Sequence, residues 1–296
     1  SGGKMINSGL IVNQGFEFML YSTPVQTKDF TFDLNINLSR NVSKVKELAD
    51  GVDYLFFNGD ANFPINVGTR VGHRLGEIYA KNLYKRDENG NMIVNKQGRP
   101  TKVSGEDAFQ YTLDHPIGNI EPDLLMSVSP SFTYKGFTLS ALFDMKFGGD
   151  IVSVSEAMAT STGLAARTAN RGNAENGWKI VAPGVTADGT VNSTAMNAQR
   201  YYTSMSGMAE EFVYDASFIK LKELSLGYSF PKSILKKTPL TSLNVAFVAR
   251  NLAYLMKHTP GTSPEGGYDT SMFSQAIDYM SVPYTRTFGL SINLGF

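Results

Sequence analysis

An unbroken alternation of apolar and polar residues ends the sequence. In "TRTFGLSINLGF" the residues between the apolar positions are small or polar, and the apolar positions are Phe288, Leu290, Ile292, Leu294 and Phe296. Successive side chains of a β-strand point to opposite faces, so this pattern predicts a strand with one apolar face.

The same two-residue alternation recurs along the chain. It is clearest in "DFTFDLNINLSR" (29–40) and "GFTLSALFDMKFGG" (136–149). Further alternating runs lie near 9–20, 74–84, 124–134, 217–229 and 242–252. The run at 124–134 is separated from the next only by Lys135-Gly136, which predicts a two-residue hairpin turn.

The length of these runs indicates where the apolar face points. They span about 10–12 residues, whereas strands of soluble proteins are nearer 5–6 and tilted membrane-spanning strands need about 9–11. We therefore predict an all-β fold of antiparallel transmembrane barrel strands, apolar outward to lipid and polar inward to the lumen. The outward set would include Leu34, Ile36, Phe143 and Ile292, and the inward set Asn35, Asn37 and Asn293. The alternative is a soluble or surface β-sheet protein, serving adhesion or assembly, whose apolar face is its core.

Connection lengths provide a separate test. Short connections cover 21–29, 135–136 and 231–241, and long ones follow the runs near 40, 147 and 252. Outer-membrane barrels have short periplasmic turns and long extracellular loops, which makes 148–216 a long extracellular loop. The alternation of direction requires one more strand, Met92–Asn95, and gives about nine strands. An odd set cannot close alone, so residues 1–296 are predicted to be part of a larger barrel; a self-contained barrel of about eight or ten strands remains the other possibility.

Composition narrows the function classes. The chain of 296 residues has 27 basic and 27 acidic residues, which does not favour binding to nucleic acid. It has no cysteine, which excludes disulfides and thiolate chemistry. The start, "SGGKMINSG", lacks an initiator Met and a signal peptide, and we expect either that the start has been removed or that the sequence is an excerpt.

Five blocks of sequence resemble a known family. "EFVYDASFIKLKELSLGYSFPKSIL" (211–235), "SLNVAFVARNLAYL" (242–255) and the terminal "YTRTFGLSINLGF" are similar to the C-terminal end of SusC/RagA-type TonB-dependent outer-membrane transporters. "GKMINSGLIVNQGFEFML" and "SFTYKGFTLSALFDMKFGGDIV" resemble earlier strands of the same barrel. The blocks appear in the family's order and cover most of the chain.

The resemblance implies a plugged barrel of about 22 strands in the outer membrane of a Gram-negative bacterium. Such transporters import glycans, oligosaccharides or peptides with energy delivered through TonB, and a SusD-like surface lipoprotein covers the extracellular mouth. The plug and the TonB-contacting segment are absent from these residues, as are the remaining N-terminal barrel strands. The resemblance also implies that Phe296 is a signal for barrel assembly.

The long loop 148–216 holds the candidate ligand contacts. Aromatic rings stack on sugar faces, and guanidinium groups hydrogen-bond hydroxyls or carboxylates; the candidates are Trp178, Tyr201, Tyr202, Arg167 and Arg171. The competing interpretation is that these side chains pack the loop against the barrel or the lid.

Other chemistry has little support in the sequence. "RDENGN" (86–91) lacks the ligand spacing of a calcium loop and is better explained as a tight turn. The histidines are scattered, and no nucleophile elbow or phosphate-binding loop occurs. We therefore predict no enzyme activity, no metal and no cofactor. Aromatic residues near strand ends predict interfacial girdles, for example Tyr84, Tyr134, Phe137, Tyr228 and Tyr254.

Overall fold

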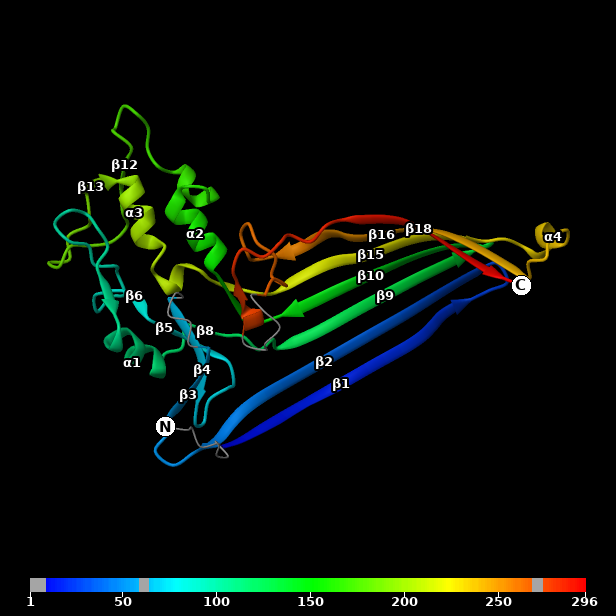
Figure 1. The fold of residues 1–296 in the computed structure, drawn as a ribbon, viewed down its shortest axis with the longest axis horizontal. Coiled ribbons are helices and arrows are strands. Elements are labelled where there is room, and N and C mark those ends of the chain that lie inside the picture. The colour runs from blue at the N-terminus through cyan, green and yellow to red at the C-terminus, as the bar shows by residue number, and fades with distance from the viewer. Residues whose placement is uncertain (1–8, 59–63, 268–273) are drawn as a thin grey trace, which may run out of the picture.

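A computed structural model describes residues 9–58, 64–267 and 274–296, and these form two regions (Figure 1). One region is a sheet of seven long antiparallel strands. The other, which we call the loop assembly, is built from the described residues of the three long connections 49–123, 148–217 and 258–286 and lies at one end of the sheet. The short turns between strands lie at the opposite end, together with the small helix α4 (Lys232–Leu235).

The strands of the large sheet are neighbours in the order in which they occur along the chain. They are β1 (Gly9–Gln26), β2 (Phe30–Leu48), β9 (Leu124–Tyr134), β10 (Phe137–Phe147), β15 (Phe218–Ser229), β16 (Ser242–Lys257) and β18 (Thr287–Gly295). Within the described residues the sheet is open, with β1 and β18 at its edges. The predicted all-antiparallel strands are therefore confirmed.

The turn between β9 and β10 has the predicted geometry. Lys135 and Gly136 have φ values of 47° and 90°, as a two-residue hairpin with right-handed strand twist requires. Tyr134 and Phe137 on either side of it face each other in the ladder.

One row of residues, which we call the apolar row, crosses all seven strands on one face of the sheet. It consists of Val25, Phe32, Phe132, Leu139, Leu226, Phe247 and Leu290. All of these residues except Phe32 are exposed, and Leu290 is 67% exposed. The ring of Phe32 stacks on that of Phe132 at a centroid distance of 4.7 Å. This face of the sheet is thus apolar and uncovered in the described structure.

The adjacent row, on the opposite face, is made of small and polar side chains except for Val248, and we call it the polar row. It consists of Asp33, Ser131, Ser140, Ser225, Val248 and Gly289. Thr23 of the first strand donates a hydrogen bond to Asp33 over 2.7 Å. The predicted two-faced character of the strands is therefore present as continuous rows.

Aromatic residues form a band at the short-turn end. Phe30, Tyr134, Phe137 and Tyr228 are successive cross-strand partners, and the rings of Phe137 and Tyr228 lie 4.5 Å apart. The prediction was wrong for Tyr84, which is buried in the loop assembly, and for Tyr254, which hydrogen-bonds on the opposite face of the sheet.

The loop assembly has its own secondary structure. The first connection contains β3 (Tyr54–Asn58), β4 (Ile65–Arg70), β5 (Glu77–Ala80), β6 (Asn82–Tyr84), β7 (Lys102–Ser104), α1 (Glu106–Asp114) and β8 (Gly118–Asn119). The second contains β11 (Asp150–Ser153), α2 (Val154–Thr162), η1 (Ala166–Ala169), β12 (Lys179–Val181), β13 (Ala195–Asn197), α3 (Ala198–Met205), η2 (Ala209–Glu211) and β14 (Val213–Asp215). The third contains η3 (Ser274–Ala276) and β17 (Ile277–Asp278).

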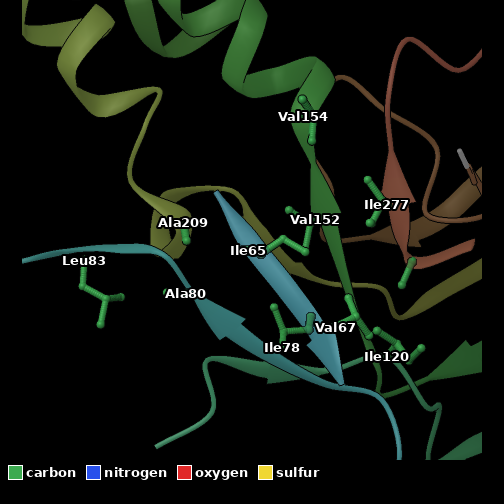
Figure 2. Packing of buried hydrophobic residues seen from close by; sticks show 11 residues of the cluster. Ile65, Val67, Ile78, Ala80, Leu83, Ile120, Val152, Val154, Ala209 and Ile277 are labelled. Atoms are coloured by element: carbon green, nitrogen blue, oxygen red, sulfur yellow. The ribbon is translucent and has the colours of Figure 1, made fainter. Parts of the chain in front are cut away.

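The three connections share one hydrophobic core. Figure 2 shows Ile65 from the first connection, Val152 from the second and Ile277 from the third packed together, and all three are buried. Val152 and Ile277 are also partners in a parallel pairing of β11 with β17. The long loops are thus folded against one another.

This architecture corrects the predicted strand count. The runs near 74–84 and Met92–Asn95 belong to the loop assembly, and the large sheet has seven strands where about nine were expected. All four residues of β5 are buried, so its apolar positions serve the loop core. Met92 and Val94 form only isolated bridges, to Arg86 and Pro100. With two strands fewer, every remaining strand keeps its predicted direction. The lengths of the connections therefore could not reveal that the predicted strand count was too high.

Candidate functional site

The loop assembly brings three of the five predicted ligand contacts together. Arg167, Tyr201 and Tyr202 line a hollow of about 380 Å³ in the second connection, whose lining does not include Arg171 or Trp178. The hollow is also bordered by apolar side chains, among them Ile180 and Met205. Whether this hollow contacts a ligand remains a prediction.

The two tyrosines are placed by α3. The Asn197 side chain caps this helix by accepting a hydrogen bond from the backbone N–H of Arg200 over 3.1 Å. Tyr201 and Tyr202 are each 7% exposed, and the Tyr202 hydroxyl lies 2.9 Å and 2.7 Å from the carbonyl oxygens of Arg167 and Asn170. Burial raises the pKa of Tyr201 to about 12, and the Glu211 carboxylate adds to that effect. Both rings therefore pack the loop.

Arg167 is held by contacts inside the protein. Its Nη1 lies 3.0 Å from Glu211 Oε2, and its Nη2 donates to the Tyr214 hydroxyl over 2.6 Å. Its Nε lies 3.7 Å from Glu156 Oε1, and the guanidinium stands 5.1 Å from the centroid of the Phe212 ring. The charge of Arg167 is thus already matched, and an anionic ligand would have to compete with these carboxylates.

Arg171 and Trp178 lie outside this hollow. Arg171 donates to the carbonyl oxygens of Thr168 over 2.8 Å and Gly163 over 3.1 Å, so it ties η1 to the end of α2. Trp178 is 51% exposed and has a φ of 56°. Of the five predicted residues, Trp178 is the one whose ring is most available to a ligand.

A larger hollow, of about 650 Å³, lies between β15, β16 and the third connection. Lys220 in its wall is 3% exposed and its Nζ lies 2.6 Å from Glu265 Oε2. The Tyr254 hydroxyl also hydrogen-bonds Glu265, and the Lys220 Nζ stands 4.6 Å from the centroid of the Tyr284 ring. Lysine and carboxylate thus fasten the third connection to the sheet.

The register places this hollow on the polar side of the sheet. Lys220 pairs with Asp144 on one neighbouring strand and with Tyr254 on the other. Asp144 in turn pairs with Ser127, and Lys222 Nζ lies 2.6 Å from Asp144 Oδ2. The hollow therefore opens on the face that carries the polar row.

The lining of the larger hollow suits hydrogen bonding. Asn251 and Arg286 lie in its wall, and the Ser281 Oγ is buried without a hydrogen-bond partner among the described residues. The Tyr284 ring is 55% exposed. This combination of donors, acceptors and an accessible ring can bind a polar ligand. No local sequence pattern marks this site, because Glu265 lies 45 residues from Lys220.

Two other predicted features can be located. The "RDENGN" segment is a tight turn, in which Asp87 Oδ1 accepts from the backbone N–H groups of Asn89 and Asn91 over 3.0 Å and 2.8 Å. Phe296 directly follows β18 and is 82% exposed; its role in assembly remains a prediction. Within the part of the chain that the structure describes, no group of three or more His, Asp or Glu residues is arranged to hold a metal ion.

No helix in the described residues is long and apolar enough to cross a membrane. The long, two-faced antiparallel strands and the folded loops at one end define the class of the fold: the strands are those of a transmembrane barrel, seen as an open section. The solved structure of the RagAB peptide transporter has this fold, with a TM-score of 0.65 at 18% identity, over 98% of this chain and 29% of that one. The RagAB peptide importer in its "closed-closed" state gives a TM-score of 0.64 at 19% identity, over 98% of this chain and 30% of that one.

Curated proteins extend the match to the sequence. The chain is 28% identical over 308 residues to TonB-dependent receptor P3 of Formosa agariphila, covering 98% of this chain and 29% of the receptor. It is 27% identical over 305 residues to TonB-dependent receptor SusC of Bacteroides thetaiotaomicron, covering 98% and 27%. No protein-family model matches. The resemblance to SusC/RagA-type transporters is confirmed, and the chain spans less than a third of the length of these relatives.

Proposed function

We propose that this chain is the C-terminal section of the barrel wall of a SusC-type, TonB-dependent importer in the outer membrane of a Gram-negative bacterium. The complete transporter takes up oligomeric nutrients, either glycans, oligosaccharides or peptides. The observation that carries the proposal is the exposed apolar row, which crosses every strand of the large sheet and lies next to the polar row on the other face.

Exposure of the apolar row to water would be costly. Exposed apolar surface is unfavourable by about 25 cal/mol per Å², and a contiguous apolar face normally marks an interface or a membrane. The two clusters of buried hydrophobic residues belong to the loop assembly. Lipid against the apolar row accounts for its exposure, and a water-filled lumen accounts for the serines of the polar row.

The same arrangement supports an orientation of the chain in the membrane. Long loops of outer-membrane barrels are extracellular and short turns are periplasmic. The loop assembly then lies outside the cell, and the Lys135-Gly136 turn lies in the periplasm (Figure 1). The two hollows are accordingly on the side from which a nutrient arrives, and we assign ligand contact to the larger one, with Tyr284, Asn251 and Arg286.

Partners follow from the same proposal. The edges β1 and β18 need further strands of the barrel, because unpaired backbone groups are costly in lipid. A SusD-like lipoprotein covers the extracellular mouth, and TonB acts through a plug. Among the solved structures with this fold, RagAB is named a peptide transporter, and peptides are accordingly among the nutrients proposed for the complete protein. Phe296 serves as the assembly signal of the last strand.

Cysteine labelling tests the membrane placement. The chain has no cysteine, so single cysteines can be introduced at Leu226 in the apolar row and at the neighbouring Ser225 in the polar row. In intact outer membranes containing the full-length protein, a charged, water-soluble maleimide should modify Ser225→Cys and spare Leu226→Cys. Wild-type full-length protein gives the background, and detergent plus urea should make both positions reactive.

The outcome separates the proposal from its main alternative. Equal reaction at both positions in intact membranes, or recovery of the protein in the soluble fraction, would contradict a lipid-facing apolar row and favour a soluble or surface β-protein. Import is measured separately, as uptake of fluorescently labelled oligosaccharides and peptides by cells with and without the full-length protein.

A further inference from the structure

A third hollow lies at the outer surface of the loop assembly, where the first and second connections meet. Its volume is about 630 Å³, and every residue that lines it is polar or charged. The lining consists of Arg99, Asn197, Gln199, Arg200, Thr203 and Ser204. These described residues supply two guanidinium groups, two side-chain amides and two hydroxyls, and no carboxylate.

The two arginines differ from several others of the chain in having no carboxylate partner among the described residues, a feature that they share with Arg40, Arg171 and Arg286. Arg70, Arg86 and Arg250 lie within 2.9 Å of a carboxylate oxygen. Among the described residues, Arg99 and Arg200 have no ion pair, and the only side-chain bond of Arg99 runs from its Nε to Ser204 Oγ over 3.1 Å. Both residues are exposed, so water and salt weaken the repulsion between their charges, and an anion bound in the hollow would contact two unpaired guanidinium groups.

The position of Arg99 is fixed by its turn. The Asn95 side chain accepts from the backbone N–H groups of Gln97 and Arg99, each over 3.0 Å. Gly98 has a φ of 72°, and a Cβ built there would lie 2.3 Å from the carbonyl oxygen of Thr194. Only glycine permits this contact, which holds the turn against the second connection and brings Arg99 beside Ser204.

Arg200 is placed by α3. Its backbone N–H is bonded to the side chain of Asn197, and its side chain is exposed beside the hydroxyls of Thr203 and Ser204. The start of this helix carries partial positive charge, which adds to the two guanidinium groups. Arginine presents a planar fork of donors that matches the two oxygens of a carboxylate or sulfate.

We propose that this hollow binds an acidic oligosaccharide, with Arg99 and Arg200 on its carboxylate or sulfate groups and the amides and hydroxyls on its sugar hydroxyls. The absence of any apolar side chain among the described residues of the lining disfavours a peptide, whose affinity would come largely from burying apolar side chains. The inference deepens the proposed function, and rests on it only for the side of the membrane from which the ligand arrives.

Binding is tested on the full-length protein extracted from outer membranes in detergent. The probes are dextran sulfate, polygalacturonate and uncharged dextran of matched chain length. The test variant is Arg99→Gln/Arg200→Gln. The matched control is Lys96→Gln/Lys179→Gln, which removes two positive charges from exposed neighbouring positions that do not line the hollow.

We expect the Arg99→Gln/Arg200→Gln variant to raise the Kd for at least one acidic probe about tenfold or more, because charge-assisted contacts are lost. The control should change Kd less than about twofold, since surface charges away from a site contribute mainly through screened attraction. Arg99→Lys/Arg200→Lys should fall between wild type and the glutamine variant, because lysine keeps the charge without the fork. Dextran should bind no more tightly than background.

Three results would overturn the proposal. These are no binding of either acidic probe, an equal loss in both double variants, and binding of dextran as tight as that of dextran sulfate. Loss of a co-purifying partner protein, with acidic-probe binding unchanged, would assign the hollow to a protein interface instead. The binding test can fail while the proposed function stands, because labelling of Leu226→Cys and Ser225→Cys tests the membrane placement independently.

Discussion

The large sheet and the loop assembly use the same apolar residues in opposite ways. Leu290 and Phe288 on β18 are 67% and 63% exposed, whereas Val152 on β11 and Phe212 beside β14 are completely buried. The sheet has long strands with an uncovered apolar face, and the loop assembly has short strands around a core of its own. Apolar residues of the sheet's apolar face are therefore exposed, whereas those of the loop assembly form its core.

The difference shows that the two regions depend on different environments. Burial of apolar side chains among themselves stabilises the loop assembly in water. In the large sheet, by contrast, all residues of the apolar row except Phe32 are exposed among the described residues, and we assign that row to lipid. We therefore expect truncation of an apolar side chain to destabilise the loop assembly more than the sheet. In the sheet, we expect a charge to be destabilising on the apolar row and tolerated on the polar row.

The largest effect is expected for Phe212→Ala in the loop assembly. Phe212 is completely buried among the side chains of the second connection, and it carries the Arg167 guanidinium on its ring. Truncating a buried Phe costs about 3–5 kcal/mol. In hydrogen-exchange measurements on the full-length protein, the amides of 148–217 should therefore exchange faster in this variant than in the wild type.

The matched control is Phe288→Ala, the same change at a position of the sheet that is 63% exposed. It should leave the protection of 148–217 unchanged. If both substitutions weakened that segment equally, the loop assembly would not have an independent core, and the contrast between the regions would be wrong.

The sequence predicted one of these regions well. Each of the seven strands of the large sheet coincides with an alternating run, because two-residue alternation sustained over ten or so residues is the period of a strand and does not fit a helix. The Lys135-Gly136 turn was predicted from local sequence in the same way, since few sequences allow positive φ at both positions.

The loop assembly was not predictable in the same way. The alternation of β5 is indistinguishable by sequence from that of a spanning strand, and only its burial on both faces separates them. Contacts such as Lys220 with Glu265 and Val152 with Ile277 join distant segments, and no local pattern marks them. Arg167, Tyr201 and Tyr202 were among the five predicted contacts, and the sequence left open whether they contact a ligand or pack the loop. The burial of the two tyrosines depends on contacts with distant segments, which no local pattern marks.

The next effect concerns the apolar row. Leu226→Arg places a charge on the face that we assign to lipid, which costs about 2 kcal/mol at a depth between the midplane and the interface. Ser225→Arg, one residue away on the polar row, should cost little. The measurement is the urea concentration at which the full-length barrel loses its heat-modifiable mobility in gels. Equal midpoints for the two variants would mean that the apolar row does not face lipid.

A smaller effect is expected where the two regions meet. Glu265→Gln leaves Lys220 with a neutral acceptor in place of a carboxylate, and a hydrogen bond to a charged group is worth about 1.5–3 kcal/mol. Because glutamine can still accept, the loss should be about 1.5 kcal/mol. Hydrogen exchange of 259–266 should rise while that of 148–217 stays constant. An unchanged rate in 259–266 would show that this ion pair does not hold the third connection.

The smallest effect is a dependence on pH within the loop assembly. Burial raises the pKa of Asp150. The carboxylate of Asp215, which is paired with Asp150 between β11 and β14, raises this pKa further. The backbone N–H of Asn119, which donates a hydrogen bond to the Asp150 carboxylate over 2.8 Å, lowers it. A raised pKa means that the folded state binds the proton more readily. The resulting stability is fully present below the ordinary pKa of about 3.9 and is lost as pH rises through the raised value.

Amide exchange of β11 and β14, corrected for its intrinsic rate, should therefore slow as pH falls from 7 towards 4. Asp150→Asn keeps an acceptor for Asn119 and should remove this dependence. Asp87 gives the opposite sign, because the Asn91 side-chain amide lowers the pKa of its carboxyl. The stability it contributes is present above its ordinary pKa and is lost as pH falls, so the turn at 87–91 should loosen in acid. If both sites responded in the same direction, the pH effect would belong to the whole loop assembly and the assignment to Asp150 would be wrong.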